Sequence, residues 1–298
     1  MIIKAEDSIL YDMFFDRNYG IKGEKIMKKR ICTVLMLLGM VVFTGCAEQE
    51  SSDAVNQNTD VIYQISLLQG LTYGDYYGSI TVDELKQHGD TGIGTFDGLN
   101  GELIMVDGEV YRAAADGSVE VVSSEETIPF ADVSFMDNDK TVDIEDISSF
   151  DELCSELNKL VEERGKNRFY MIRIDGTFQE ANVRSEYAQK EPYKPLAEVL
   201  EYDQTFFDYK DIEGTLVGLY CPPYMSDVNA VGWHLHFISK DKTKGGHVLG
   251  LSIEDAVLTW DDTDAFQMQL PQNEMFSDFD LTVDQSEDIK KVETNVEH

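Results

Sequence analysis

A chain of 298 residues that is 42% hydrophobic can form one large or two medium globular domains around a real core. A formal net charge of −33 at pH 7 argues against nucleic-acid binding, because phosphates are neutralised by clustered Lys and Arg. The same charge repels anionic substrates at long range, so an anionic ligand needs a local positive centre, such as a metal ion.

The first predicted element is a secretion signal in residues 27–46, MKKRICTVLMLLGMVVFTGC. Basic residues precede an apolar run that is shorter than the length of about 20 residues that a transmembrane helix needs. The run ends in FTGC, which resembles the lipobox of bacterial lipoproteins and implies cleavage before Cys46 and lipid attachment to its thiol. The alternatives are an ordinary signal peptide and an uncleaved anchor. Residues 47–60 are then a polar, flexible tether.

Residues 1–26 do not fit in front of a signal peptide, whose basic region normally starts at the initiator methionine. We therefore expect them to be an upstream extension and translation to start at Met27; a precursor peptide from residues 1–26 would contradict this. The signal predicts a protein that is exported and lipid-anchored to the outer face of the bacterial cytoplasmic membrane, with secretion as the alternative. The lipid anchor would be its only contact with a membrane.

From about Val61 the pattern is mostly β with a few helices. Residues 81–89, TVDELKQHG, predict a short helix, because Thr81 and Glu84 have the spacing of a capping box. His88, in the last turn of this helix, is expected at the surface, where its charge suits the helix dipole.

Residues 101–114, GELIMVDGEVYRAA, predict two strands joined by a tight turn at Asp107 and Gly108. Residues 148–165, SSFDELCSELNKLVEERG, predict the clearest helix of the chain. Its apolar residues recur at helical spacing, and Ser149 begins a second capping box.

The second half of the chain predicts closely spaced strands. Residues 168–178, RFYMIRIDGTF, read as a strand that ends at a Gly turn, and residues 193–203 as a short helix opened by Pro195. Five further strand candidates follow: GTLVGLYC, VGWHLHFIS, GHVLGLSI, DAVLTW and AFQMQL. Such short spacing favours antiparallel pairing. We expect an α+β fold of mostly antiparallel or mixed β-sheets with a few peripheral helices, in two β-rich subdomains, before a polar C-terminal helix or tail.

The four cysteines are too widely separated for a zinc or redox motif. Cys154 and Cys221 could pair outside the cell. Two buried free thiols are the favoured interpretation, because a chain of this size does not need a disulfide to be stable.

Three of the five histidines, His234, His236 and His247, fall within fourteen consecutive residues. On a strand, His234 and His236 face one side while Leu235 and Phe237 face the other. The segment SKDKTKGG is a turn region, and an antiparallel return after it could bring His247 beside the pair. Three neutral imidazoles with open positions form the pattern of a catalytic zinc site. The alternative is an exposed strand face without metal.

Four segments in order carry a resemblance to a known family: GIGTFDGLNGELIMVDGEVY, YKPL, GWHLHFISKDKTKGGHVLG and the acidic C-terminal tail. Together they closely resemble the bacterial alpha-acetolactate decarboxylases over residues 61–298. The resemblance implies a zinc-dependent carboxy-lyase that converts 2-acetolactate to acetoin and carbon dioxide in the butanediol pathway. It also implies a homodimer and a metal site in the C-terminal half of this catalytic domain.

The resemblance implies roles for individual residues. They are the zinc ligands His234, His236 and His247, the active-site glutamate Glu102, the pocket residue Thr95, the active-site arginine Arg184 and, in the tail, the metal-site glutamate Glu293.

Two departures from the family pattern affect this assignment. After Arg184 the chain reads Ser-Glu-Tyr, where the family more often has Thr or Ser followed by Val-Pro. The tail also offers Glu287 and Glu297 as rivals to Glu293. Without the resemblance, ordinary roles as surface charges or ion-pair partners account for Glu102 and Arg184.

The implied reaction is the decarboxylation of a β-keto acid, which needs an electron sink at the ketone oxygen. Zinc would act as the Lewis acid, Arg184 would bind the carboxylate, and Glu102 or Glu293 would deliver the proton. The alternative function is a surface-anchored zinc-binding lipoprotein that delivers metal to a transporter without catalysis. The short, basic SKDKTKGG segment disfavours it, because such proteins often carry a longer loop rich in His and Asp.

Overall fold

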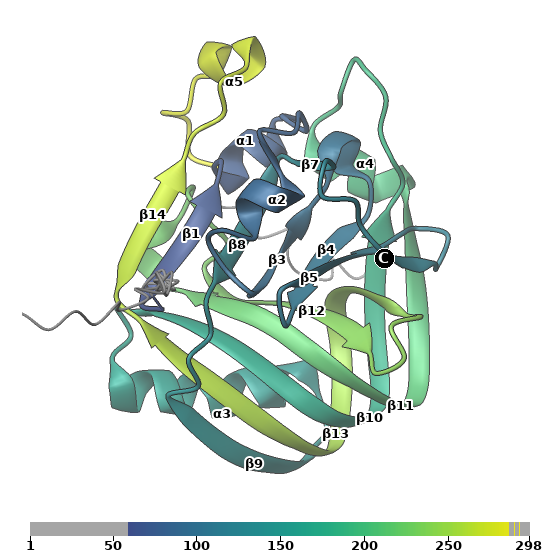
Figure 1. The fold of residues 1–298 in the computed structure, drawn as a ribbon, viewed down its shortest axis with the longest axis vertical. Coiled ribbons are helices and arrows are strands. Elements are labelled where there is room, and N and C mark those ends of the chain that lie inside the picture. Colours follow the sequence, from purple (N-terminus) through teal and green to yellow (C-terminus); the bar gives the residue numbers. More distant parts are fainter. Residues whose placement is uncertain (1–58, 286–288, 290–291, 293–298) are drawn as a thin grey trace, which may run out of the picture. The chain divides into compact units, whose positions relative to one another are not determined.

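The computed structural model describes residues 59–285, 289 and 292, which Figure 1 draws as a coloured ribbon. The predicted upstream extension, the secretion signal with Cys46 and residues 47–58 of the tether lie outside these residues. Among the described residues, no helix has the length and apolar character needed to cross a membrane.

The larger sheet has seven strands in the order β14-β1-β8-β3-β4-β5-β6. Their bounds are β14 (Ala265–Gln269), β1 (Val61–Ile65), β8 (Phe130–Ser134), β3 (Thr91–Thr95), β4 (Glu102–Val106), β5 (Glu109–Ala113) and β6 (Val119–Val121). Only the pairing of β1 with β14 is parallel within this described sheet. The predicted hairpin between β4 and β5 is confirmed. Asp107 and Gly108 both have positive φ, as a two-residue turn between twisted strands requires.

The five-stranded sheet closes on itself. Its strands are β10 (Phe169–Glu186), β11 (Gln204–Cys221), β12 (Gly232–Ser239), β13 (Gly245–Thr263) and β9 (Lys140–Ile147). β10 pairs along one edge with β11 and along the other with β13. Because β12 pairs with both β11 and β13, these four strands form a closed ring of pairings, seen as long curved ribbons in Figure 1.

Short helices and a two-stranded ladder complete the fold. They are α1 (Leu68–Thr72), α2 (Val82–Leu85), α3 (Phe150–Arg164), α4 (Leu196–Tyr202), α5 (Glu274–Asp278), the 3-10 turns η1 (Asp97–Leu99) and η2 (Pro223–Met225), and the strands β2 (Ile80–Thr81) and β7 (Thr127–Ile128). The capping box of α2 is confirmed with both of its hydrogen bonds. In α3, Ser149 Oγ accepts from the Glu152 amide at 3.1 Å. The predicted fold of antiparallel and mixed sheets with a few short helices is confirmed.

The two large sheets pack against each other through a buried apolar cluster, which includes Ile104 of β4 and Val217 and Leu219 of β11. Alternation along β12 places Leu235 and Phe237 in a different core, which α3 covers. The opposite face of β12 is therefore turned toward the seven-stranded sheet.

Two predicted strand boundaries are wrong. The strand that was expected to end at a Gly turn near residue 176 continues as β10 to Glu186. The two predicted strands GHVLGLSI and DAVLTW are parts of the single strand β13. Gly176 lies between β11 and β13, where a Cβ atom would come within 2.3 Å of the Asp255 carbonyl oxygen. The glycine permits close packing of neighbouring strands and does not form a turn.

Two side-chain predictions have opposite outcomes. His88 was expected at the surface but is half-buried, with its ring stacked on Tyr63 at a centroid distance of 3.7 Å. Burial lowers the pKa of His88. Cys154 and Cys221 are free thiols, as the favoured interpretation expected, but only Cys221 is buried, whereas Cys154 is partly exposed.

Candidate functional site

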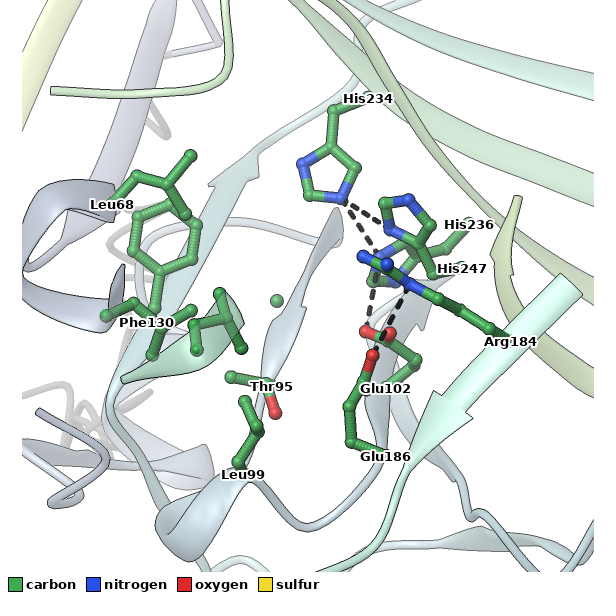
Figure 2. Close-up of a pocket in the computed structure, with 13 residues that line it drawn as sticks. Leu68, Thr95, Leu99, Glu102, Phe130, Arg184, Glu186, His234, His236 and His247 are labelled. Carbon is green, nitrogen blue, oxygen red and sulfur yellow. Dashed lines mark hydrogen bonds and ion pairs between the residues drawn. The ribbon is translucent and has the colours of Figure 1, made fainter. Parts of the chain in front are cut away.

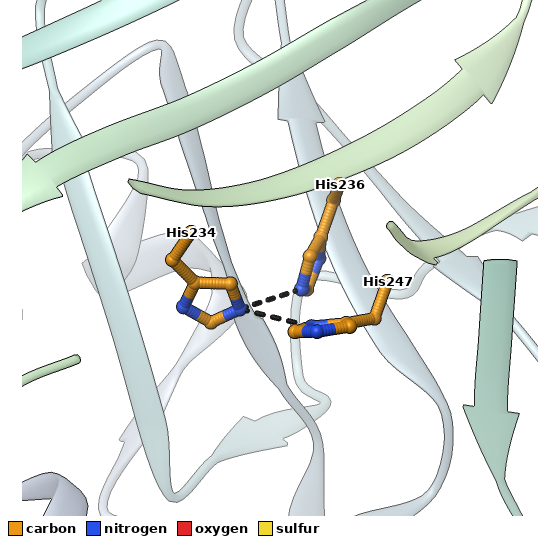
Figure 3. Close-up of side chains that lie close together, drawn as sticks. All are labelled: His234, His236 and His247. Atoms are coloured by element: carbon orange, nitrogen blue, oxygen red, sulfur yellow. Dashed lines mark hydrogen bonds between the residues drawn. The ribbon is translucent and has the colours of Figure 1, made fainter. Parts of the chain in front are cut away.

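Three imidazoles converge where β12 and β13 meet, as the spacing predicted (Figure 3). His234 and His236 share one face of β12, and His247 pairs directly with His236 across the ladder. Directly paired residues of an antiparallel ladder point to the same side. His234 Nε2 consequently lies 3.2 Å from His236 Nε2 and 3.1 Å from His247 Nδ1.

Arg184 joins this group from the other side of β13. It is the ladder partner of His247 on β10, so His236, His247 and Arg184 follow one another across three adjacent strands. The guanidinium is buried, and its Nη2 donates to the Val292 carbonyl at 2.5 Å. A buried cation therefore lies beside the three imidazoles, as Figure 2 shows.

The seven-stranded sheet supplies the opposite wall. Glu102 begins β4 and is the ladder partner of Thr95 at the end of β3. Its Oε2 lies 3.4 Å from His236 Nε2. The Thr95 hydroxyl donates to the Gly101 carbonyl at 2.8 Å, and this bond holds the chain just before Glu102. The structure thus brings six of the predicted site residues to one place between the sheets: Thr95, Glu102, Arg184, His234, His236 and His247.

Glu186 also lies in the site, although the sequence analysis assigned it no role. It is only 4% exposed, and its Oε1 is 3.4 Å from Arg184 Nε. The signal that could have identified it is strand alternation, because Glu186 follows Arg184 by two residues and shares its face of β10. The departure from the family pattern after Arg184 thus places a second carboxylate beside the site's arginine.

Two residues of the C-terminal segment reach the site. Ile289 and Val292 are buried in an apolar cluster with Leu68 of α1 and Leu196 of α4. The predicted tail glutamate Glu293 and its two rivals lie outside the described residues. The role assigned to Glu293 stays a prediction.

These groups line one pocket with an empty volume of about 400 Å³ (Figure 2). Its polar side is formed by the histidines, Arg184, Glu102, Glu186 and Thr95, and its apolar side by Leu68, Leu71, Leu99, Phe130 and Leu196. A small polar ligand that enters the pocket meets charged groups on one side and apolar side chains on the other.

The histidine group has the properties of a metal-binding set. Its ligand atoms lie within 4.8 Å of one another. Burial, with the nearby positive charge of Arg184, lowers the pKa of His234 to about 3, and burial lowers the pKa of His236 well below its ordinary value. Both rings are neutral near pH 7, the form that binds metal.

The hydrogen bond of His236 fixes its tautomer. Its Nδ1 lies 2.8 Å from the Leu103 carbonyl oxygen, which can only accept, so Nδ1 carries the proton. The lone pair of Nε2 then points toward the other two imidazoles and is available to a metal ion. A backbone carbonyl that orients a ligating histidine in this way is a common support of metal sites.

Comparison with known proteins is consistent with this site. Residues 62–283 match the family model described as alpha-acetolactate decarboxylase. The alpha-acetolactate decarboxylase of Methanosarcina mazei is 40% identical over 241 residues, which are 81% of this chain and 83% of that protein. The one from Bacillus licheniformis is 35% identical, over 80% of this chain and 92% of that protein.

A solved structure agrees in fold. The crystal structure of alpha-acetolactate decarboxylase from Bacillus subtilis strain 168 superposes with a TM-score of 0.76 at 34% identity. The match covers 79% of this chain and all of that one.

Proposed function

This chain belongs to the alpha-acetolactate decarboxylase family, and we propose that it decarboxylates 2-acetolactate, a 2-hydroxy-3-keto acid, to acetoin and carbon dioxide with zinc as cofactor. The observation that carries the proposal is the meeting of three imidazoles, a buried arginine and Glu102 in one pocket. His234, His236 and His247 would hold the zinc ion, which supplies Lewis-acid stabilisation of the negative charge that develops on the ketone oxygen.

Arg184 is proposed to bind the anionic end of the substrate. A chain with a net charge of −33 needs a local cation to hold a keto acid, and the buried Arg184 meets that need. Its bonds to the Val292 carbonyl and to Glu186 hold the guanidinium plane in one orientation. The planar fork can then present its remaining donors to a carboxylate.

Glu102 is proposed to hold the proton that replaces the departing carboxylate. It lies against His236, across the pocket from the apolar wall, so a substrate between these groups would meet it on one face. Protonation from a single face gives a chiral product. Glu293 remains the alternative proton donor. Thr95 acts as a positioning residue, because its hydroxyl fixes the turn before Glu102.

The apolar wall has its own part in the proposed reaction. Leu68, Leu99 and Phe130 keep bulk water from the carbon atoms of the substrate. Exclusion of water strengthens the electrostatic interactions of Arg184 and protects the carbanion-like species from non-specific protonation.

Incubation of the purified, zinc-loaded protein with 2-acetolactate tests the function. We expect equal amounts of carbon dioxide and acetoin, with one acetoin enantiomer in excess. A protein that binds zinc tightly and releases neither product would instead support the alternative of a zinc-delivery lipoprotein. The lipid anchor at Cys46 and the homodimer stay predictions, which mass spectrometry of the mature N-terminus and light scattering would test.

Replacement of Glu186 with glutamine is expected to lower kcat about tenfold, which corresponds to about 1.4 kcal/mol on the barrier, without raising KM. Glu186 offsets part of the positive charge of Arg184. Without that carboxylate, Arg184 binds the ground-state carboxylate of the substrate more strongly. Negative charge leaves that group during the reaction, so tighter ground-state binding slows the chemical step.

Steady-state kinetics separate this effect from general damage. Glu180→Gln is the matched control, because Glu180 lies on the same strand but is exposed and pairs with Lys210. A Glu186→Gln enzyme with a raised KM and an unchanged kcat would contradict the proposed role.

A further inference from the structure

A second group of ligating side chains lies outside the histidine site. Oxygen atoms of Asp137, Asp139 and Asp261 come within 4.8 Å of one another. Asp137 and Asp139 belong to the segment between β8 and β9, whereas Asp261 lies near the end of β13. Thr59 Oγ1 donates to Asp137 Oδ2 at 2.9 Å, so the segment that leads into β1 meets this cluster as well.

Asp261 sets this cluster apart from ordinary surface carboxylates. Its exposed fraction is 0%, and no amide, hydroxyl or cationic group in the described part of the chain donates to either carboxylate oxygen. Two residues further along β13, the fully buried hydroxyl of Thr263 also finds no partner within residues 59–285, 289 and 292. A buried carboxylate without a hydrogen bond is costly unless a proton or a cation neutralises it.

The carboxylates around Asp261 further disfavour its charged form. Burial raises the pKa of Asp261 to about 8, and so do the negative charge of Asp137, a hydrogen bond shared with Asp137, and then the charges of Asp139 and Asp60. The nearby donors Arg164 and Trp260 bind the Asp262 carboxylate and not that of Asp261.

We propose that Asp137, Asp139 and Asp261 form a second metal site, which binds a divalent cation with the size and hardness of Ca²⁺. All three ligands are carboxylates, and hard cations prefer oxygen ligands, whereas the imidazole set suits zinc. A calcium ion 2.3–2.6 Å from each ligand can bridge oxygens up to about 5 Å apart, which matches the observed separations. The exposed Asp137 and Asp139 leave room for water molecules to complete the coordination.

The position of the site indicates a structural role. β8 belongs to the seven-stranded sheet, and β9 and β13 belong to the five-stranded sheet. Strands β1 and β14 also begin at this corner, where the Ala265 amide donates to the Asp60 carbonyl at 3.0 Å (Figure 1). A cation held here ties together the two sheets whose facing sides form the histidine pocket. It acts on stability and not on the chemistry at the imidazoles.

Thermal unfolding and calorimetric titration of the purified full chain, saturated with zinc, test the site. Calcium chloride at about 10 mM is expected to raise Tm by about 3 °C or more, relative to sodium chloride of equal ionic strength. The expected Kd is on the order of 10⁻⁴–10⁻³ M, the weak end of the range of protein calcium sites. Magnesium chloride is expected to have a smaller effect, because magnesium needs a tighter octahedron.

Two variants locate the response. Asp137→Asn/Asp139→Asn changes only exposed side chains and should raise the calcium Kd at least about tenfold. Asp261→Asn removes the buried repulsion, so it should raise Tm in calcium-free buffer and abolish the calcium response. The control Asp143→Asn/Glu145→Gln removes the same charge from exposed positions of β9 and should leave the response intact.

Three results would overturn the site. In the first, calcium changes neither Tm nor the heat of titration, which is the result if Asp261 is held by a proton shared with Asp137. In the second, the Asp137→Asn/Asp139→Asn protein responds like the wild type. In the third, magnesium stabilises the protein as much as calcium. None of these results bears on the decarboxylase proposal, whose assay is independent of added calcium.

Discussion

A His234→Ala protein is expected to lose its bound zinc and to lose decarboxylase activity by roughly 10³-fold or more. His234 Nε2 lies within 3.2 Å of a nitrogen of each of the other two imidazoles, so its removal leaves two ligands, too few to hold the metal. His234 is a better target than His236, whose Nδ1 also bonds to the Leu103 carbonyl and whose loss would disturb β4. Metal content by mass spectrometry and kcat/KM with 2-acetolactate are the measurements.

The control for this prediction is His88→Ala. His88 stacks on Tyr63 and does not line the pocket, so this variant should keep both zinc and activity. Wild-type protein treated with a zinc chelator should behave like His234→Ala and regain activity when zinc is restored. A His234→Ala protein that retains stoichiometric zinc and normal turnover would refute the assignment of the metal centre.

An Arg184→Lys protein is expected to lose about 10²–10³-fold in kcat/KM while it retains its zinc. The positive charge is preserved, but the planar fork is lost. Arg184 uses separate nitrogens for Glu186 and for the Val292 carbonyl, and a lysine ammonium cannot replace both while it also binds a substrate carboxylate. Steady-state kinetics together with the zinc content distinguish this outcome from the loss of metal in His234→Ala.

Arg173→Lys provides the matched control on the same strand. Arg173 pairs with Asp107 and Asp175 outside the pocket, and its replacement should leave kcat/KM nearly unchanged. If Arg184→Lys stays within about threefold of the wild type, charge alone suffices and the oriented fork has no role. The double variant Arg184→Lys/Glu186→Gln should be less than additive, because the two residues act through one ion pair.

Local features of the fold could be predicted because a few neighbouring residues determine them. The capping box of α2 depends on a three-residue spacing, and the β4–β5 hairpin depends on two residues that accept positive φ. The continuation of β10 through Gly176 could not be predicted in this way. A glycine is compatible with a turn or with close strand packing, and only the neighbouring strands decide which one occurs.

The same distinction between local and long-range determinants applies to the candidate site. By itself, the sequence determined that His234 and His236 share a strand face and that His247 follows after a short turn, because strand alternation has a fixed period of two. Sequence resemblance added Arg184, Glu102 and Thr95 to the site, but it assigned no role to Glu186.

Only the tertiary structure decided which groups meet. Closure of the β10–β13 ladder puts Arg184 beside His247, and packing of the two sheets puts Glu102 against His236. The same packing brings Asp261 to Asp137, more than a hundred residues away in the chain. These contacts depend on how whole strands pair and how the sheets bury their apolar faces. Local periodicity sets which side of a strand a residue faces, but not which strand lies opposite.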